Sequence, residues 1–328
     1  MSYEEMRRQA RALQREIEDR VNETIYHYTS AEGFRGIVTS SELWLTNAAF
    51  VNDTTECKAF LEDCAKDLIQ DESLGNNDVK ETLGFRLEDG PENDKYYIAS
   101  FSRARDSLSQ YRAYGKFCIG LDPRKMRRNG FHMYRCVYRT RDINDWVRKK
   151  ARVRQWNGDC LQADDRCGVA GDLVFAASVK YKNAAYRDER EIRMVAVSGG
   201  SPGPYTRIMA PLTAQDSAKD ICAHEPPIHF RDCCGHGMAT PYVKFFFSSR
   251  KPEEDTWEDI QRETVAQVKE RKLREEEKMP RELLPITEVW IGPMAQQEEV
   301  RLASEIMLRE KGYENVQIIA SQIPYRGR

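Results

Sequence analysis

The most chemically suggestive stretch of this chain is AYRDEREIRMVAV, at residues 185–197. Glu189, Glu191 and Arg193 alternate along an expected strand that continues into the apolar run MVAV, so their side chains should share one face. One face of a sheet seldom carries two acids and an arginine without a partner. Two interpretations fit: an ion pair at a solvated strand start, or a carboxylate set in a cleft and oriented by Arg193.

A lone histidine, His27, raises a second question, because it stands between two tyrosines in IYHYTS at residues 25–30. A solitary histidine is commonly packed and hydrogen-bonded to nearby backbone, but at a strand end it could instead meet a ligand. Two further segments offer partners for a ligand. KYYIASFS ends in Ser100 and Ser102, and the expected helix DSLSQYRAYG carries Tyr111 and Tyr114 on one side.

The pattern of expected strands and helices around these residues predicts an α+β fold with a mixed or antiparallel core sheet and flanking helices. We expect residues 1–22 to form an amphipathic helix and residues 23–328 to form a single α+β domain. Within that domain the pattern predicts a charged helix at 253–279 and a closing strand-helix-strand at 286–323. The N-terminal helix should pack on the body, and a homo-oligomer formed through it is the alternative.

Composition narrows the classes of protein to consider. The 328 residues carry a formal net charge of -2, which indicates no global attraction to nucleic acid or to a membrane surface, so a basic patch would have to be local. No apolar run approaches the roughly 20 residues that span a bilayer. We therefore expect a soluble cytoplasmic protein.

The cysteine and histidine residues suggest a metal site only weakly. Nine cysteines, an odd number, favour reduced thiols over a disulfide framework. The segment CAHEPPIHFRDCCGHG offers zinc six donors, although its spacing matches no standard finger and two prolines interrupt it. These donors are Cys222, His224, His229, Cys233, Cys234 and His236. A loop with free thiols is the favoured interpretation.

The order of several segments resembles a bacterial family known as domain of unknown function 2971. The segments are IYHYTS, LWLTN, NDTTE, SFSRARDSLSQYRAYG, REIRMV, IHFR, PYVKFFF, EVWIGP and SQIPYR. The resemblance runs from about residue 23 to the C-terminus. It implies a family but no mechanism, which has to come from the residues.

The layout is also similar to that of ADP-ribosyltransferases, in which a histidine, a serine or tyrosine, and a glutamate come in this order from separate strands. Cleavage of the nicotinamide-ribose bond of NAD builds positive charge on the ribose, which a carboxylate stabilises. The resemblance implies that Glu191 is the catalytic carboxylate, that Glu189 assists the acceptor and that His27 orients NAD. The NAD-binding residues would be His27, Tyr28, Thr29, Ser100, Ser102, Tyr111, Tyr114 and Arg193.

The sequence thus predicts an NAD-dependent ADP-ribosyltransferase or NAD glycohydrolase with an unknown macromolecular acceptor, such as a bacterial toxin or defence effector. Two alternatives stay open. Asp53, Glu56, Glu189 and Glu191 could bind Mg²⁺ or Mn²⁺ in a nuclease or phosphodiesterase, because hard cations prefer carboxylate oxygen. A noncatalytic module that binds a nucleotide or a protein partner is the other.

The transferase hypothesis makes one sharp geometric prediction. His27 should lie within side-chain reach of Glu191, with at least one of Ser102, Tyr111 and Tyr114 between them. We also expect His27→Ala and Glu191→Gln to abolish NAD turnover at little cost in stability, because cleft residues contribute little to a core.

Overall fold

The structure is a computed structural model of the chain. It describes residues 20–51, 55, 57–89, 95–128, 131–158, 163–198, 226–232, 239–249 and 262–324. For residues 89, 152–158 and 163–169 it describes the backbone only. The expected N-terminal helix therefore lies almost wholly outside the described residues, and so does the start of the expected charged helix at 253–279.

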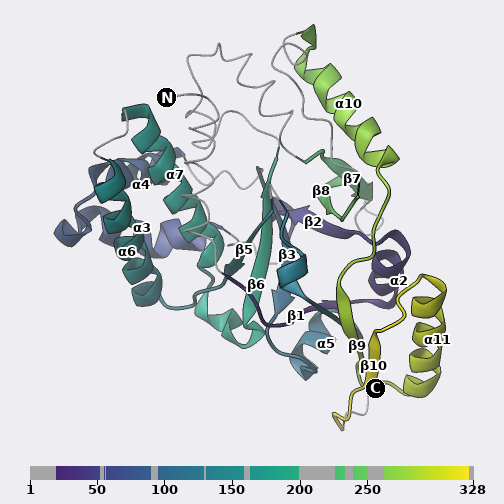
Figure 1. The fold of residues 1–328 in the computed structure, drawn as a ribbon. Helices are drawn as coiled ribbons and strands as arrows, with labels where there is room; N and C mark the ends of the chain where they lie inside the picture. Colours follow the sequence, from purple (N-terminus) through teal and green to yellow (C-terminus); the bar gives the residue numbers. More distant parts are fainter. Residues whose placement is uncertain are drawn as a thin grey trace.

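A sheet of ten strands, counted over the described residues, runs through the middle of the molecule (Figure 1). Its pairings are antiparallel except for the parallel pair β9 and β10, so the predicted α+β class with a mixed sheet is confirmed. The strands are β1 (Ile25–Thr29), β2 (Leu43–Asn47), β3 (Tyr96–Ser102), β4 (Phe117–Leu121), β5 (Phe131–Arg135), β6 (Glu191–Val197), β7 (His229–Asp232), β8 (Ala239–Phe245), β9 (Ile286–Ile291) and β10 (Gln317–Ala320).

The sheet divides at β3. One edge of β3 pairs with β6 along its whole length. The other edge pairs with β2 at Tyr97 and Ile98, and then with β1 at Ser102. The strand order β10-β9-β4-β1 forms a first wing on this edge, and β2-β8-β7 forms a second wing. The two wings thus meet at a fork between Ile98 and Ser102.

Helices cover the sheet from several sides (Figure 1). Helices α3, α4, α6 and α7 form a layer beside β5 and β6, whereas α2 and α11 lie near the first wing. The Ser30 hydroxyl caps α2 by accepting a hydrogen bond from the Gly33 amide. The helices are α2 (Ala31–Ser40), α3 (Ala59–Gln70), α4 (Asn77–Asp89), α5 (Leu108–Tyr114), α6 (Thr140–Gly158), α7 (Ala163–Lys180), α10 (Val265–Lys278) and α11 (Gln297–Glu310).

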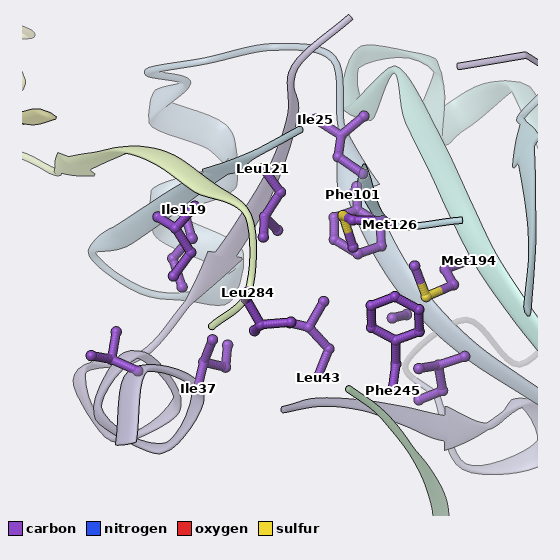
Figure 2. Close-up of a cluster of buried hydrophobic side chains, with 14 of the residues drawn as sticks. Ile25, Ile37, Leu43, Phe101, Ile119, Leu121, Met126, Met194, Phe245 and Leu284 are labelled. Atoms are coloured by element: carbon purple, nitrogen blue, oxygen red, sulfur yellow. The ribbon is translucent and has the colours of Figure 1, made fainter. Parts of the chain in front are cut away.

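The largest apolar core fills the space between the two wings (Figure 2). It takes Ile25 and Ile119 from the first wing, Leu43 and Phe245 from the second, and Met194 from β6. A separate core lies within the layer of α3, α4, α6 and α7, and a third joins that layer to the sheet. Burial of each large side chain contributes about 1.5–3 kcal/mol, so these cores fix the sheet on which the polar residues stand.

The C-terminal strand-helix-strand belongs to this sheet, because β9 pairs with β4 along residues Ile286–Ile291. The described part of the charged helix is α10, which begins with a capping box between Thr264 and Gln267. Among the helices that the structure describes, none combines the length and the apolar character needed to cross a membrane.

Gly292, which follows β9, gives a direct test of how closely α5 packs on the first wing. A Cβ atom at Gly292 would lie 2.8 Å from the ring of Tyr111, which is itself buried. We expect Gly292→Ala to lower the free energy of unfolding by about 1–3 kcal/mol in urea denaturation, because the ring cannot move aside without disturbing the core.

Gly36 in the middle of α2 is the matched control, because a Cβ atom there would meet nothing within 4 Å. Gly36→Ala should raise the free energy of unfolding by roughly 0.5–1 kcal/mol. Equal effects of the two substitutions would contradict the close packing of Tyr111 against Gly292.

Candidate functional site

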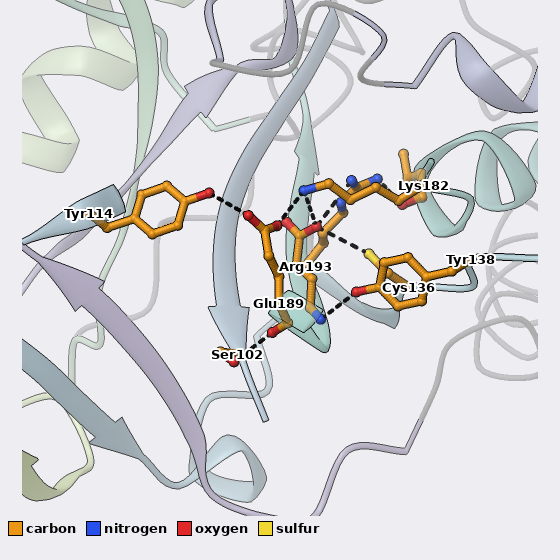
Figure 3. Close-up of polar contacts among 9 residues, drawn as sticks. Ser102, Tyr114, Cys136, Tyr138, Lys182, Glu189 and Arg193 are labelled. Carbon is orange, nitrogen blue, oxygen red and sulfur yellow. Dashed lines mark hydrogen bonds and ion pairs between the residues drawn. The ribbon is translucent and has the colours of Figure 1, made fainter. Parts of the chain in front are cut away.

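Glu191, the first residue of β6, is the centre of a buried polar cluster. Its partners Cys136, Lys182 and Arg193 are labelled in Figure 3. Only 4% of this residue is exposed. Its Oε2 atom lies 2.8 Å from Lys182 Nζ and 3.2 Å from Arg193 Nη2, and it accepts a hydrogen bond from the Cys136 thiol at 3.5 Å. One buried carboxylate is therefore matched by two cations.

The two cations decide the charge of Glu191. Burial alone raises its pKa, but the attraction of Arg193 and Lys182 outweighs burial and lowers the pKa to about 2. Arg193 is fully buried, and its Nη1 donates to the Val179 carbonyl at 2.6 Å. The cluster thus carries its ions at neutral pH, inside the protein.

Backbone hydrogen bonds hold three chain segments around this carboxylate. The Cys136 amide donates to the Glu191 carbonyl at 3.0 Å, and the Glu191 amide donates to the Tyr138 hydroxyl at 2.7 Å. The Lys182 amide donates to the Val137 carbonyl at 3.0 Å. Residues 136–138 therefore tie the segment after α7 to the start of β6, and this fixes the Lys182 ammonium beside Glu191.

Glu189 lies outside the strand, as the last residue of the 3₁₀ helix η5 (Ala184–Glu189). The expectation that Glu189 alternates with Glu191 along a strand is wrong, because Arg190 takes a left-handed conformation with φ 47° and breaks the alternation. Lys182 nevertheless joins both acids, since its Nζ lies 2.8 Å from Glu189 Oε2. The Tyr114 hydroxyl donates to Glu189 Oε1, also at 2.8 Å.

Glu189 is the acid of this pair that solvent reaches, with 20% of its side chain exposed. Two exposed tyrosines flank it: Tyr114 of α5, 38% exposed, and Tyr186 of η5, 36% exposed. The Lys182 ammonium lies 4.6 Å from the centre of the Tyr186 ring. Ser100 is exposed as well, although it sits in the central strand β3. We call these five residues the Glu189 site.

His27 lies on the other face of the sheet. The register pairs Tyr26 with Ser102 and Ser102 with Glu191, so these three side chains share a face, and the neighbouring His27 points the opposite way. The prediction that His27 lies within reach of Glu191 is therefore wrong, and the catalytic layout that joined His27 and Glu191 around NAD fails with it. Thr29, two residues further along β1, shares the face of His27 and is likewise separated from Glu191.

The contacts of His27 explain its place in the sequence. Its Nδ1 lies 3.0 Å from the Ser100 carbonyl, at the fork where β1 and β2 separate from β3. Its ring lies 5.6 Å from that of Phe101, and burial lowers its pKa. The neutral imidazole thus donates its proton to a backbone carbonyl at the fork.

Four further residues of the predicted NAD site are buried, and their contacts are with neighbouring parts of the protein. The Tyr28 hydroxyl donates to the Ala104 carbonyl at 2.8 Å, and the Ser102 hydroxyl donates to the Glu189 carbonyl at 2.6 Å. Tyr111 packs against Gly292, and Arg193 is enclosed in the Glu191 cluster. Of the predicted ligand-binding residues on this face, Ser100, Tyr114 and Glu189 are the ones accessible to a ligand.

Lys182 and Tyr186 are members of the site that the motifs did not indicate. One signal for Lys182 was available: two acids and one arginine on a shared face leave a negative charge to be balanced. The sequence did not show which of the many lysines and arginines would balance it, because that depends on how α7 ends against residues 136–138.

Several candidate metal ligands lie outside the described residues: Asp53, Glu56, Cys222, His224, Cys233, Cys234 and His236. His229 is described, and its Nε2 lies 2.8 Å from Glu276 Oε1. In the described ranges, no three His, Cys, Asp or Glu side chains gather in a way that could hold a metal ion.

Comparison with known proteins gave no match to a family model, to a curated protein or to a solved structure. The resemblances drawn from the sequence segments therefore stay predictions.

The Glu191 cluster predicts that the two acids differ in their effect on stability. We expect Glu191→Gln to lower the free energy of unfolding by about 3–5 kcal/mol, because the buried Arg193 loses the carboxylate beside it and the two buried cations then face Glu189 alone. This replaces the expectation that the substitution costs little. Glu189→Gln, at a partly exposed pair, should cost less than about 1 kcal/mol. Urea denaturation of both variants measures the difference, and equal costs would contradict the assignment.

The low pKa of Glu191 also predicts a pH dependence. Its pKa falls from 4.5 to about 2 on folding, so its contribution to stability is complete above pH 4.5 and is lost as the pH falls toward 2. The stability difference between the wild type and Glu191→Gln should therefore shrink over this window. Urea denaturation of both proteins from pH 6 to pH 2.5 tests this, and a difference that stays constant would refute it.

Proposed function

We propose that the chain binds NAD at the Glu189 site and cleaves its nicotinamide-ribose bond, as an ADP-ribosyltransferase-like enzyme or an NAD glycohydrolase. The observation that carries the proposal is that Glu189 is a solvent-accessible carboxylate flanked by two exposed tyrosines, whereas Glu191 is enclosed. Glu189 therefore takes the catalytic role that the sequence analysis gave to Glu191. The acceptor is water or a macromolecule.

The chemistry of the site supports this assignment. Bond cleavage builds positive charge on the ribose, and a carboxylate fixed in place stabilises that charge without having to reorganise. Tyr114 and Lys182 fix the Glu189 carboxylate, one at each oxygen. The Tyr114 ring, in a residue that is 38% exposed, suits the flat, cationic nicotinamide, whereas the Tyr186 ring already has the Lys182 ammonium over it.

The proposal departs from the layout implied by the resemblance, because it makes no use of His27. Ser100 is an exposed residue on the face of Glu191, and its hydroxyl also interacts with that carboxylate. In this proposal it replaces the imidazole as the group that hydrogen-bonds a ribose hydroxyl. His27→Ala is thus expected to act through the fork of the sheet and not through contact with NAD.

One observation favours a second candidate function, a noncatalytic nucleotide-binding module. Lys182 lies beside Glu189 and balances part of its charge, which lowers its capacity to stabilise a cationic ribose. The same arrangement still offers aromatic faces and hydrogen-bonding groups to a nucleotide.

The full chain should bind NAD in isothermal titration calorimetry and release nicotinamide, measured by chromatography. We expect Glu189→Gln to lower the rate of release at least about 100-fold, because the transition state loses its carboxylate. Glu310→Gln, at an exposed acid at the end of α11, is the control and should keep the wild-type rate.

The outcomes separate the two candidates. Release of nicotinamide that survives Glu189→Gln contradicts the catalytic role of Glu189. Binding of NAD without release supports the noncatalytic module. A wild-type chain that neither binds NAD nor cleaves it contradicts the proposed NAD-cleaving enzyme.

A further inference from the structure

Two guanidinium groups lie against one buried ring just beyond the end of β8. The ring is that of Phe246, a residue that is 1% exposed and directly follows this strand. The Cζ atom of Arg128 lies 4.5 Å from the centre of the ring, and that of Arg281 lies 3.5 Å from it. Arg128 Nη1 also donates to the Phe246 carbonyl. Two like charges are therefore held close together at a largely buried place.

Arg281 is the better matched of the two cations. Its Nε atom lies 2.8 Å from Oε1 of Glu42, a residue that is 8% exposed, and its Nη1 donates to the Glu276 and Met279 carbonyls at 3.0 and 2.8 Å. Glu42 is shared with a second cation, because its Oε2 lies 3.9 Å from Lys244 Nζ. One carboxylate thus serves both Arg281 and Lys244.

Arg128 has no carboxylate of its own. In the part of the chain that the structure describes, no acid forms an ion pair with it. The acid whose charge acts on Arg128 is Glu276, and Oε1 of that residue already lies 2.8 Å from His229 Nε2. Burial lowers the pKa of the Arg128 guanidinium, and the charge of Arg281 opposes the effect of Glu276 on it.

The group as a whole therefore holds one more cation than acid, whereas the cluster around Glu191 is balanced. Its charged members are Arg128, Arg281 and Lys244 against Glu42 and Glu276. A cation that is partly removed from water is costly unless an opposite charge replaces its hydration. Solvent reaches the group, because 18% of the Arg281 side chain is exposed and Arg128 is only half-buried. An anion from solution can supply the missing charge.

We propose that Arg128 and Arg281 bind a small oxyanion, the phosphate or carboxylate group of a ligand, beside Phe246. A guanidinium presents paired N–H donors that match two oxygens of such a group. Contacts with the Phe246 ring hold both guanidinium groups in place before the ligand arrives, which lowers the entropic cost of binding. The site is separate from the Glu189 site, since it is built from the segment before β5, the end of β8 and the segment after α10.

Thermal unfolding of the full chain tests the proposal with two probes, sodium phosphate and sodium acetate. Each is compared, at about 20 mM, with sodium chloride at equal ionic strength, so that general screening is the same in all samples. At least one probe should raise the wild-type melting temperature by about 2 °C or more, because a ligand that binds only the folded state stabilises it. A larger shift with phosphate assigns a phosphate group to the ligand, and a larger shift with acetate assigns a carboxylate.

Arg128→Met is the decisive variant, because it removes the charge and keeps a long side chain on the ring. It should abolish the shift, and in chloride it should melt close to the wild type, since the lost charge had no acid of its own. Arg128→Lys keeps the charge but not the paired donors, so it should show less than about half of the shift. Arg309→Gln, at an exposed arginine of α11, is the control and should keep the full shift.

A wild-type chain that neither probe stabilises beyond chloride would overturn the proposal. A shift that survives Arg128→Met would overturn it as well. If Arg128→Met does not fold, Arg128→Lys decides: a full shift in that variant contradicts the site, and a reduced shift supports it.

Discussion

The buried Glu191 carboxylate must be neutralised, and this requirement fixes the positions of the chain segments around it. An ionised glutamate removed from water costs several kcal/mol unless opposite charges and hydrogen bonds replace its hydration. Glu191 meets that requirement with Lys182 and Arg193, which come from different segments of the chain. The end of α7 and the start of β6 must therefore keep their relative positions. Because Lys182 also contacts Glu189, the same requirement holds the partly exposed Glu189 carboxylate beside Tyr114.

The fork in the sheet separates this polar face from the main apolar core. One edge of β3 pairs with both β1 and β2, and the wings that they lead enclose the largest hydrophobic cluster. His27 stands at the fork and bonds the Ser100 carbonyl, while the Ser100 residue itself is exposed on the strand. One short stretch of β3 thus contributes to the core on one face and to the Glu189 site on the other.

The periodicity of the sequence was enough to predict the α+β class, the strand around His27, the strand ending at Ser102 and the closing strand-helix-strand. It was not enough to place His27 relative to Glu191, because the face that a strand residue shares with another strand depends on their register. A shift of one residue would have put His27 on the same face of the sheet as Glu191. The difference in exposure between Glu189 and Glu191 could not be predicted from the sequence either, since it depends on the left-handed conformation of Arg190 and on the packing of α7.

The central claim is that Glu191 and Lys182 form a strongly coupled buried pair that organises the Glu189 site. A double-mutant cycle measures this coupling directly, using the urea denaturation of the wild type, Lys182→Met, Glu191→Gln and the double variant. The account predicts a coupling free energy of at least about 2 kcal/mol, because each single substitution leaves the buried cluster one charge out of balance, whereas in the double variant Arg193 and Glu189 balance in number. A coupling below about 0.5 kcal/mol, as found for exposed ion pairs, would contradict it.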